Sequence, residues 1–301
     1  MSFALLWIPA TLAASLLQTA RNLTQRSLTD AIGVVGATQV RFLFGLPFAL
    51  VFLALVCLAS GRLPPPPDLR YLGFTLWGSV TQILATGLML AAMRERSFSV
   101  TTAYTKTEPV QVALFGALLL GDALSLPKFA AIVVATAGVV VMSWKRGEKL
   151  SAAGLRPAVL GIAAGACFAL SAIGFRGGIL ALPDGNFVLR ATTTLTWGLV
   201  FSSLILAAYM AAADRSALRR SLENWKPSLA AGFLGAAASQ FWFIGFSLTS
   251  AANVRTLGLI EVPLAQIASR RIFSEGTSRR ELLGMAMIVV GVGVLLALSI
   301  G

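Results

Sequence analysis

A short segment at 105–116, TKTEPVQVALFG, places opposite charges inside a run of residues that is otherwise apolar. Lys106, Glu108 and Pro109 fall within four positions of it. A charge at the centre of a bilayer costs about 2.5–3.5 kcal/mol on insertion scales, so such a side chain usually faces a cavity or a partner. Two residues along a helix rotate the side chain by about 200°, so Lys106 is not the local partner of Glu108. We therefore expect Glu108 to pair across helices.

A second segment, GLIEVPLAQIAS at 258–269, repeats this arrangement with Glu261 beside Pro263. We expect Arg41, Lys106 and Arg255 to be the intramembrane charge partners of the glutamates, although snorkelling to the interface is the favoured role of Arg41. The glutamates could line a cavity, where they would bind a substrate ammonium or a proton. They could equally form buried ion pairs that fix the packing of helices.

Polar and aromatic side chains near these charges could hold a small zwitterion. An amino acid needs acceptors for its ammonium, donors for its carboxylate and an apolar wall for its side chain. Each such side chain could instead make only a hydrogen bond between packed helices. We expect the substrate site to contain Gln82, Tyr104, Glu108, Ser239, Gln240, Trp242 and Glu261.

The composition indicates an integral membrane protein. Of 301 residues, 57% are hydrophobic and 12% are charged, against about a quarter charged in soluble domains. The net charge of +12 resides in short clusters between apolar runs, which disfavours a nucleic-acid partner. Histidine is absent, and the two cysteines form no CxxC motif, so we expect no metal site, no cofactor and no enzymatic activity. A membrane enzyme remains the least favoured alternative.

The apolar runs predict an all-α fold of ten transmembrane helices, because about 20 apolar residues cross the hydrocarbon core. The expected spans are 3–20, 31–58, 70–93, 98–120, 124–144, 157–175, 186–211, 226–248, 251–272 and 282–300. The connections after odd-numbered spans hold sixteen Lys and Arg residues, against at most five in the others. This asymmetry predicts cytoplasmic odd-numbered connections and both termini outside a plasma membrane of bacterial type.

The two halves of the chain resemble each other when they are offset by 153 residues. This offset superposes Glu108 on Glu261 and Gly138 on Gly291. Because each half contains five spans, the halves (1–150 and 151–301) insert in opposite orientations. Inverted repeats of this kind recur in secondary transporters, where the substrate site lies near the midplane at the interface of the repeats. We therefore expect a central cavity between two inverted five-helix repeats.

Each half also contains a proline, an apolar run, a short acidic turn and a glycine-marked last helix. The stretches are EPVQVALFGALLLGDALSLPKFAAIVVATAGVVV at 108–141 and EVPLAQIASRRIFSEGTSRRELLGMAMIVVGVGVL at 261–295. They resemble the EamA-type repeats of the drug/metabolite transporter superfamily, and the similarity extends over nearly the whole chain. The resemblance implies a secondary exporter of small metabolites that works by alternating access. Exporters of aromatic and other neutral amino acids are the most similar group.

The leading hypothesis is thus export of neutral amino acids (aromatic, methionine-like or threonine-like), with a lipid bilayer and a small molecule as partners. The sequence is compatible with a monomer. The alternative cargo is a nucleotide sugar or sugar phosphate. Such an anion requires several cations, whereas only Lys106 and Arg255 are candidates and two glutamates oppose them.

Overall fold

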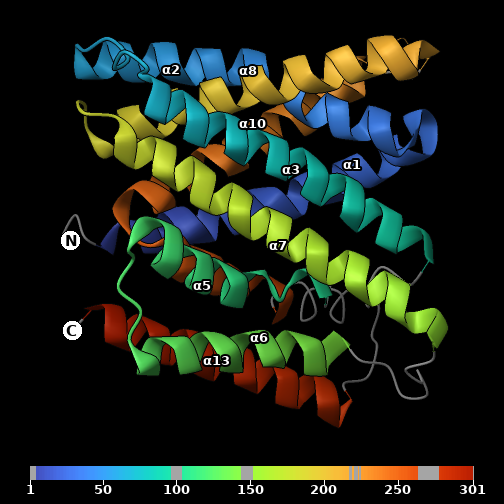
Figure 1. Cartoon of the computed structure of the whole chain (residues 1–301), viewed down its shortest axis with the longest axis vertical. Helices are drawn as coiled ribbons and strands as arrows, with labels where there is room; N and C mark the ends of the chain where they lie inside the picture. The colour runs from blue at the N-terminus through green and yellow to red at the C-terminus, as the bar shows by residue number, and fades with distance from the viewer. Residues whose placement is uncertain are drawn as a thin grey trace. The chain divides into compact units, whose positions relative to one another are not determined.

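A computed structural model of the chain describes residues 5–95, 104–143, 152–216, 219, 223, 225–263 and 278–300 (Figure 1). These residues form helices joined by short turns, which confirms the all-α class, and they contain no strand. The helices are α1 (Trp7–Leu43), α2 (Leu46–Ser60), α3 (Leu69–Glu95), α5 (Glu108–Leu120), α6 (Leu126–Ser143), α7 (Ala152–Ala181), α8 (Phe187–Ala213), α10 (Trp225–Leu248), α11 (Ala251–Gly258) and α13 (Arg279–Ile300).

Six helical segments of the described chain are long and apolar enough to cross a membrane. They are Thr38–Ser60, Leu69–Met89, Arg156–Ala181, Phe187–Ala213, Ser228–Leu248 and Arg279–Ser299. The expected spans 98–120 and 124–144 correspond to two shorter apolar helices, Glu108–Leu120 and Leu126–Met142. Residues 264–272 of the expected span 251–272 lie outside the described residues. The total of ten spans therefore stays a prediction.

The first two expected spans have different bounds in the structure. The connection predicted at 21–30 is helical, as part of α1, and a turn at Phe44–Gly45 interrupts the span predicted at 31–58. Pro47 explains the interruption, because it lies in the first turn of α2 and has no N–H for the carbonyl four residues earlier.

Helix α1 bends strongly between Arg21 and Arg41. A methyl group added at Gly235 would lie 3.4 Å from Arg21 Cδ and 3.6 Å from Arg41 Cγ. Twenty residues of a straight helix extend about 30 Å, so both side chains reach Gly235 only if α1 turns back. Helix α1 therefore brings two arginines, of which Arg21 is buried, to one point on α10.

The chain divides into two compact units, and neither coincides with a half of the sequence. Unit 1 contains Met1–Ile83 and Gly174–Thr249, and unit 2 contains Leu84–Ile173 and Ser250–Gly301. In unit 1, α10 packs along α1, and α8 packs against α10, α2 and α1. In unit 2, α6 and α13 lie side by side (Figure 1). Helix α11 packs against α5. Helices α3 and α7 each contribute residues to both units.

Contacts within unit 2 are reciprocal between positions 153 residues apart. A methyl group added at Gly138 would lie 2.7 Å from the carbonyl oxygen of Gly284, and one added at Gly291 would lie 2.6 Å from that of Ala131. The offset of 153 carries Gly138 to Gly291 and Ala131 to Gly284, so the two contacts are equivalent. This is the pattern that two copies related by an approximate two-fold axis would make. Small residues here allow the backbones of α6 and α13 to approach closely.

Candidate functional site

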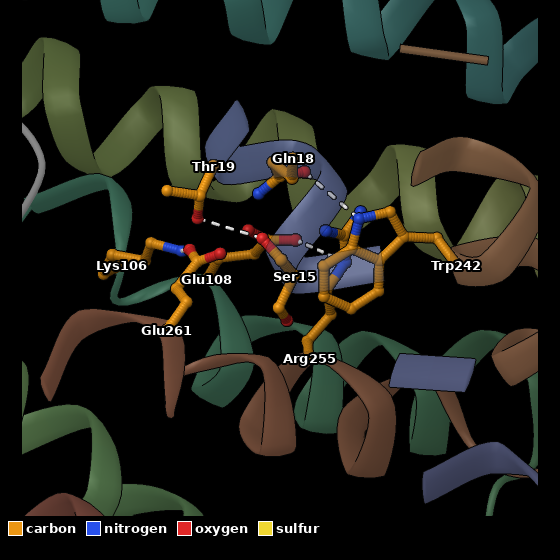
Figure 2. Close-up of polar contacts among 8 residues, drawn as sticks. All are labelled: Ser15, Gln18, Thr19, Lys106, Glu108, Trp242, Arg255 and Glu261. Carbon is orange, nitrogen blue, oxygen red and sulfur yellow. Dashed lines mark hydrogen bonds and ion pairs between the residues drawn. The ribbon is translucent and has the colours of Figure 1, made fainter. Parts of the chain in front are cut away.

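The four charged side chains expected at membrane depth in unit 2 form two cross-helix ion pairs. Lys106 pairs with Glu261, and Arg255 Nε lies 3.0 Å from Glu108 Oε1 (Figure 2). All four side chains are at least three-quarters buried. Each glutamate thus meets a cation from the other repeat.

Broken helices position these charges. Lys106 lies in a turn, with the N–H of Thr107 donating to the carbonyl of Tyr104 at 3.2 Å, and Glu108 then begins α5. In the second repeat, Leu259 and Ile260 form the corresponding turn, and helix resumes at Glu261. Each glutamate therefore lies in the first turn of a helical segment, where the helix dipole favours negative charge.

A proline follows each break by a few residues. Pro109 has no N–H for the carbonyl of Thr105, and Pro263 has none for that of Leu259. In the second repeat, Val262 N–H donates to Leu259 oxygen at 3.1 Å, which keeps that carbonyl satisfied by a tighter turn. The sequence thus dictates where both helices break.

Several buried polar atoms around the ion pairs make no hydrogen bond to described residues. They are Glu108 Oε1, Arg255 Nε, Glu261 Oε2 and Gln111 Oε1. The approach of Arg255 Nε to Glu108 Oε1 is thus an ion pair without hydrogen-bond alignment between these two atoms. Buried polar atoms are normally hydrogen-bonded, so an under-satisfied cluster indicates a place for water, an ion or a ligand.

A separate pocket lies within unit 1 and encloses about 290 Å³ of empty space, part of which opens to the outside. The enclosed free space of the pocket itself is only about 10 Å³, room for roughly one water molecule, so an amino acid would fit only if the lining side chains moved apart. Helices α1, α3, α7, α8 and α10 all contribute side chains to it. The lining residues are Arg41, Phe42, Gln82, Phe175, Leu195, Gly198, Leu199, Gly235, Ser239 and Phe243.

The pocket has a polar part and an aromatic part. Arg41, Gln82 and Ser239 supply hydrogen-bond donors, and the last two also supply acceptors. The rings of Phe175 and Phe243 lie 4.8 Å apart between their centroids. The Cζ of Arg41 lies 5.2 Å from the ring centroid of Phe42.

Glycines make room for the aromatic part. A methyl group added at Gly198 would lie 2.9 Å from Phe175 Cε1, and one added at Gly78 would lie 3.0 Å from Phe175 Cδ1. The ring of Phe175 therefore lies between α3 and α8. Any residue larger than glycine at position 78 or 198 would require this ring to shift.

Equivalent positions of the two repeats meet at this pocket. The offset of 153 residues carries Phe42 to Leu195 and Gln82 to Gly235, and all four residues line the same space. An approximate two-fold axis that relates the repeats would thus pass through or close to the pocket. Substrate sites of transporters with inverted repeats lie at such an interface.

The structure divides the sequence-predicted site residues between these two places. Gln82, Ser239 and Arg41 line the pocket of unit 1, whereas Glu108, Glu261, Lys106 and Arg255 form the ion pairs of unit 2. The remaining predicted residues, Tyr104, Gln240 and Trp242, lie at helix contacts away from the pocket lining.

Those three side chains pack or bond between helices. Gln240 Nε2 donates to Thr192 Oγ1 at 2.8 Å, linking α10 to α8. Trp242 Nε1 donates to Gln18 Oε1 at 3.1 Å, linking α10 to α1 (Figure 2). Tyr104 lies against α7, since a methyl group added at Gly161 would be 2.6 Å from its Cβ.

The sequence reasoning missed the apolar lining of the pocket. Phe42, Phe175 and Phe243 carry no polar group that would mark them among eighteen phenylalanines. The repeat is the sequence signal that could have located part of this lining. The offset of 153 residues relates Phe42 to Leu195 and Gly45 to Gly198.

Comparison with known proteins identifies the family. The sequence profile of the EamA-like transporter family matches the chain twice, at residues 5–144 and 155–297. The chain belongs to the EamA-like transporter family. This EamA-like protein is therefore a multi-pass membrane transporter of small molecules, built from two repeats.

One solved structure and one negative result complete the comparison. A crystal structure of another protein aligns with this EamA-like transporter over 97% of both chains, with a TM-score of 0.72 and 17% sequence identity. At that identity the similarity concerns the fold alone. No curated protein matches the sequence.

Proposed function

We propose that this EamA-like transporter exports neutral amino acids, including those with large apolar side chains, by alternating access through the pocket of unit 1. The observation that carries the proposal is the convergence of equivalent positions of both repeats, Phe42 with Leu195 and Gln82 with Gly235, on one pocket. Arg41 and Ser239 would bind the carboxylate, and the oxygens of Gln82 and Ser239 would accept from the ammonium. Phe175 and Phe243 would contact the side chain of the substrate.

The ion pairs of unit 2 argue against a sugar-phosphate cargo. Lys106 and Arg255 were the cations available for a phosphate, and each faces a glutamate. A phosphate would have to displace a carboxylate to reach them. A zwitterion carries no net charge and requires only the single arginine of the pocket.

We further propose that the protein resides in a plasma membrane of bacterial type, with the connections after odd-numbered spans in the cytoplasm. The asymmetry of Lys and Arg among the connections supports this orientation. We propose neither an enzymatic activity nor a cofactor for this protein.

Efflux from liposomes tests the cargo. Purified protein is reconstituted in liposomes that contain a labelled mixture of neutral amino acids, and release is compared with that from protein-free liposomes. We expect release of amino acids and none of a labelled sugar phosphate. Exchange of sugar phosphate without amino-acid release would overturn the proposal.

A pair of variants on α10 tests the pocket. Phe243→Leu should lower the efflux rate about tenfold, because loss of apolar contact in a binding pocket costs about 1–3 kcal/mol. Phe233→Leu is the matched control, since Phe233 lies on the same helix, is 43% exposed and does not line the pocket. Equal effects of the two substitutions would contradict a substrate site at this pocket.

A further inference from the structure

We propose that Gln39, Ser202 and Ser203 form a site for the ammonium group of the substrate, at the contact between α1 and α8 within unit 1. The inference rests on the proposed amino-acid export and deepens it, because it names a site one helical turn beyond the pocket lining. The ammonium contacts proposed for Gln82 and Ser239 would continue to this site.

The first observation is a difference between the serines and the threonines of α8. The hydroxyls of Ser202 and Ser203 are buried and make no hydrogen bond to any residue that the structure describes. Four threonines of the same helix each donate to the carbonyl oxygen four residues earlier, at 2.8–3.0 Å; they are Thr192, Thr193, Thr194 and Thr196. A serine in a helix can make the same local bond. The hydroxyls of Ser202 and Ser203 do not, so they stay available to a ligand.

The amide of Gln39 places a third unpaired oxygen beside these hydroxyls. Its Nε2 lies 3.5 Å from the carbonyl oxygen of Ser203, at the outer limit of a hydrogen bond. Its Oε1 is buried and pairs with no described residue. Because the nitrogen of an amide is identified by a neighbouring acceptor, Oε1 is correctly the unpaired atom. Buried polar atoms are normally paired, so three unpaired oxygens in one place indicate a ligand.

Helical register places this cluster one turn from the pocket. On α1, Gln39 lies three residues before Phe42, which lines the pocket. On α8, Ser202 lies four residues after Gly198, which also lines it. Residues three or four apart lie on one face of a helix. The cluster therefore continues the pocket-lining faces of both helices by one turn, about 5.4 Å.

Both helices extend toward the same end of the pocket. Gln39 contacts Ser203, whereas Thr196 Oγ1 lies 3.4 Å from the carbonyl oxygen of Ala49, to which it donates. The contacts on α8 thus move backward along the chain as those from α1 to α2 move forward, so these segments run antiparallel. One turn toward the N-terminus of α1 and one turn toward the C-terminus of α8 reach the same place.

The chemistry of the cluster fits an ammonium group. An ammonium has three N–H donors, which match the three unpaired oxygens, whereas a carboxylate would find donors only in the two hydroxyls. Arg41 supplies the complementary charge, with its Cζ 5.2 Å from the ring centroid of Phe42, a residue on the same helix face as Gln39. A zwitterion would thus place its carboxylate at Arg41 and its ammonium at the cluster.

The test compares the loss of unpaired and of paired hydroxyls on α8. Ser202→Ala with Ser203→Ala removes the two hydroxyls of the cluster. Thr193→Val is the matched control, because Thr193 is 1% exposed and its hydroxyl donates to the carbonyl oxygen of Leu189 at 2.8 Å. Each protein is reconstituted in liposomes, and the exchange of external labelled leucine for internal leucine is measured.

Unlabelled leucine and its hydroxy acid analogue, in which a hydroxyl replaces the ammonium, compete with the labelled leucine. The wild type and the control should prefer leucine to the analogue. In the serine double variant this preference should fall about tenfold, because hydrogen bonds to a charged group are lost. An unchanged preference in the double variant would overturn the site. Absence of leucine exchange in the wild type would instead refute the proposed amino-acid export.

Thermal unfolding in detergent without amino acid gives a readout that does not depend on the cargo. The serine double variant should have a higher midpoint temperature than the wild type, because unpaired buried hydroxyls destabilise the ligand-free protein. Thr193→Val should have a lower one, because it removes a paired hydroxyl. A midpoint lowered equally in both variants would show that internal water already satisfies the serine hydroxyls, and would overturn the proposal.

Replacement of sodium by choline on both sides of the membrane tests a metal ion as the occupant. Hard cations also take hydroxyl and carbonyl oxygens as ligands. Leucine exchange by the wild type should be the same in both salts if the cluster binds the ammonium. Exchange that requires sodium in the wild type but not in the serine double variant would assign the cluster to sodium and overturn the proposal.

Discussion

Each buried glutamate of unit 2 meets a cation from the other repeat rather than from its own sequence neighbourhood. Helical periodicity predicted a partner other than Lys106 for Glu108. In the structure Lys106 lies in the turn before α5, and Glu108 pairs with Arg255. The sequence could not assign the partners, because that assignment depends on how two broken helices face each other. An ion pair of this kind is weak evidence of function until one member is removed.

Substitutions at the Glu108–Arg255 pair test its structural contribution. Glu108→Gln or Arg255→Gln alone should destabilise the protein by about 3–5 kcal/mol, because each leaves a buried charge uncompensated. The double variant should recover to within about 1 kcal/mol of the wild type. Thermal unfolding in detergent measures all three, and a double variant no more stable than the worse single variant would contradict the pairing.

The candidate site was predictable from the sequence only in its polar half. Gln82 and Ser239 line the pocket, and their polarity within apolar spans made them visible. Arg41 also lines it, although the sequence analysis expected this arginine to snorkel to the interface or to pair with a glutamate. Phe175 and Phe243 were not, because their role depends on Gly78 and Gly198, which make room for the ring of Phe175. Tertiary packing, rather than residue type, selects these aromatic side chains.

Among the helices, proline marks breaks within three of the expected spans. The turn at Phe44–Gly45 precedes Pro47, and the turns at Lys106–Thr107 and Leu259–Ile260 precede Pro109 and Pro263. Hydropathy averages across such breaks, so it predicts one long span where the backbone has two segments. The rule that proline lacks an N–H locates them from the sequence.

The contact between α6 and α13 gives a sharp prediction for glycine. Gly291→Ala places a methyl group 2.6 Å from the carbonyl of Ala131 and should destabilise the protein by about 1–3 kcal/mol. Gly293→Ala on the same helix meets nothing within 4 Å and should be neutral or stabilising by up to about 1 kcal/mol. Thermal unfolding of the two variants measures the difference in stability. Equal midpoint temperatures would contradict the close contact between α6 and α13.

In the whole molecule, the two compact units do not coincide with the two sequence repeats. Each unit takes helices from both sequence halves, and equivalent positions meet within each: Gly138 and Gly291 in reciprocal contacts of unit 2, and Phe42 and Leu195 in the pocket of unit 1. The offset of 153 residues predicted the repeat, and the family profile matches each half. The exchange of helices between halves was not predictable, because sequence offset carries no information on which helices pack together.

Protection of a thiol in the pocket tests the central claim, that neutral amino acids bind where the repeats meet. Ser239→Cys is made with Cys167→Ala, and native Cys57 on α2, which does not line the pocket, serves as internal control. Neutral amino acids should slow labelling of Ser239→Cys by a thiol reagent in a concentration-dependent manner and leave Cys57 unaffected. Labelling of Ser239→Cys that no amino acid slows, or equal slowing at Cys57, would contradict the account.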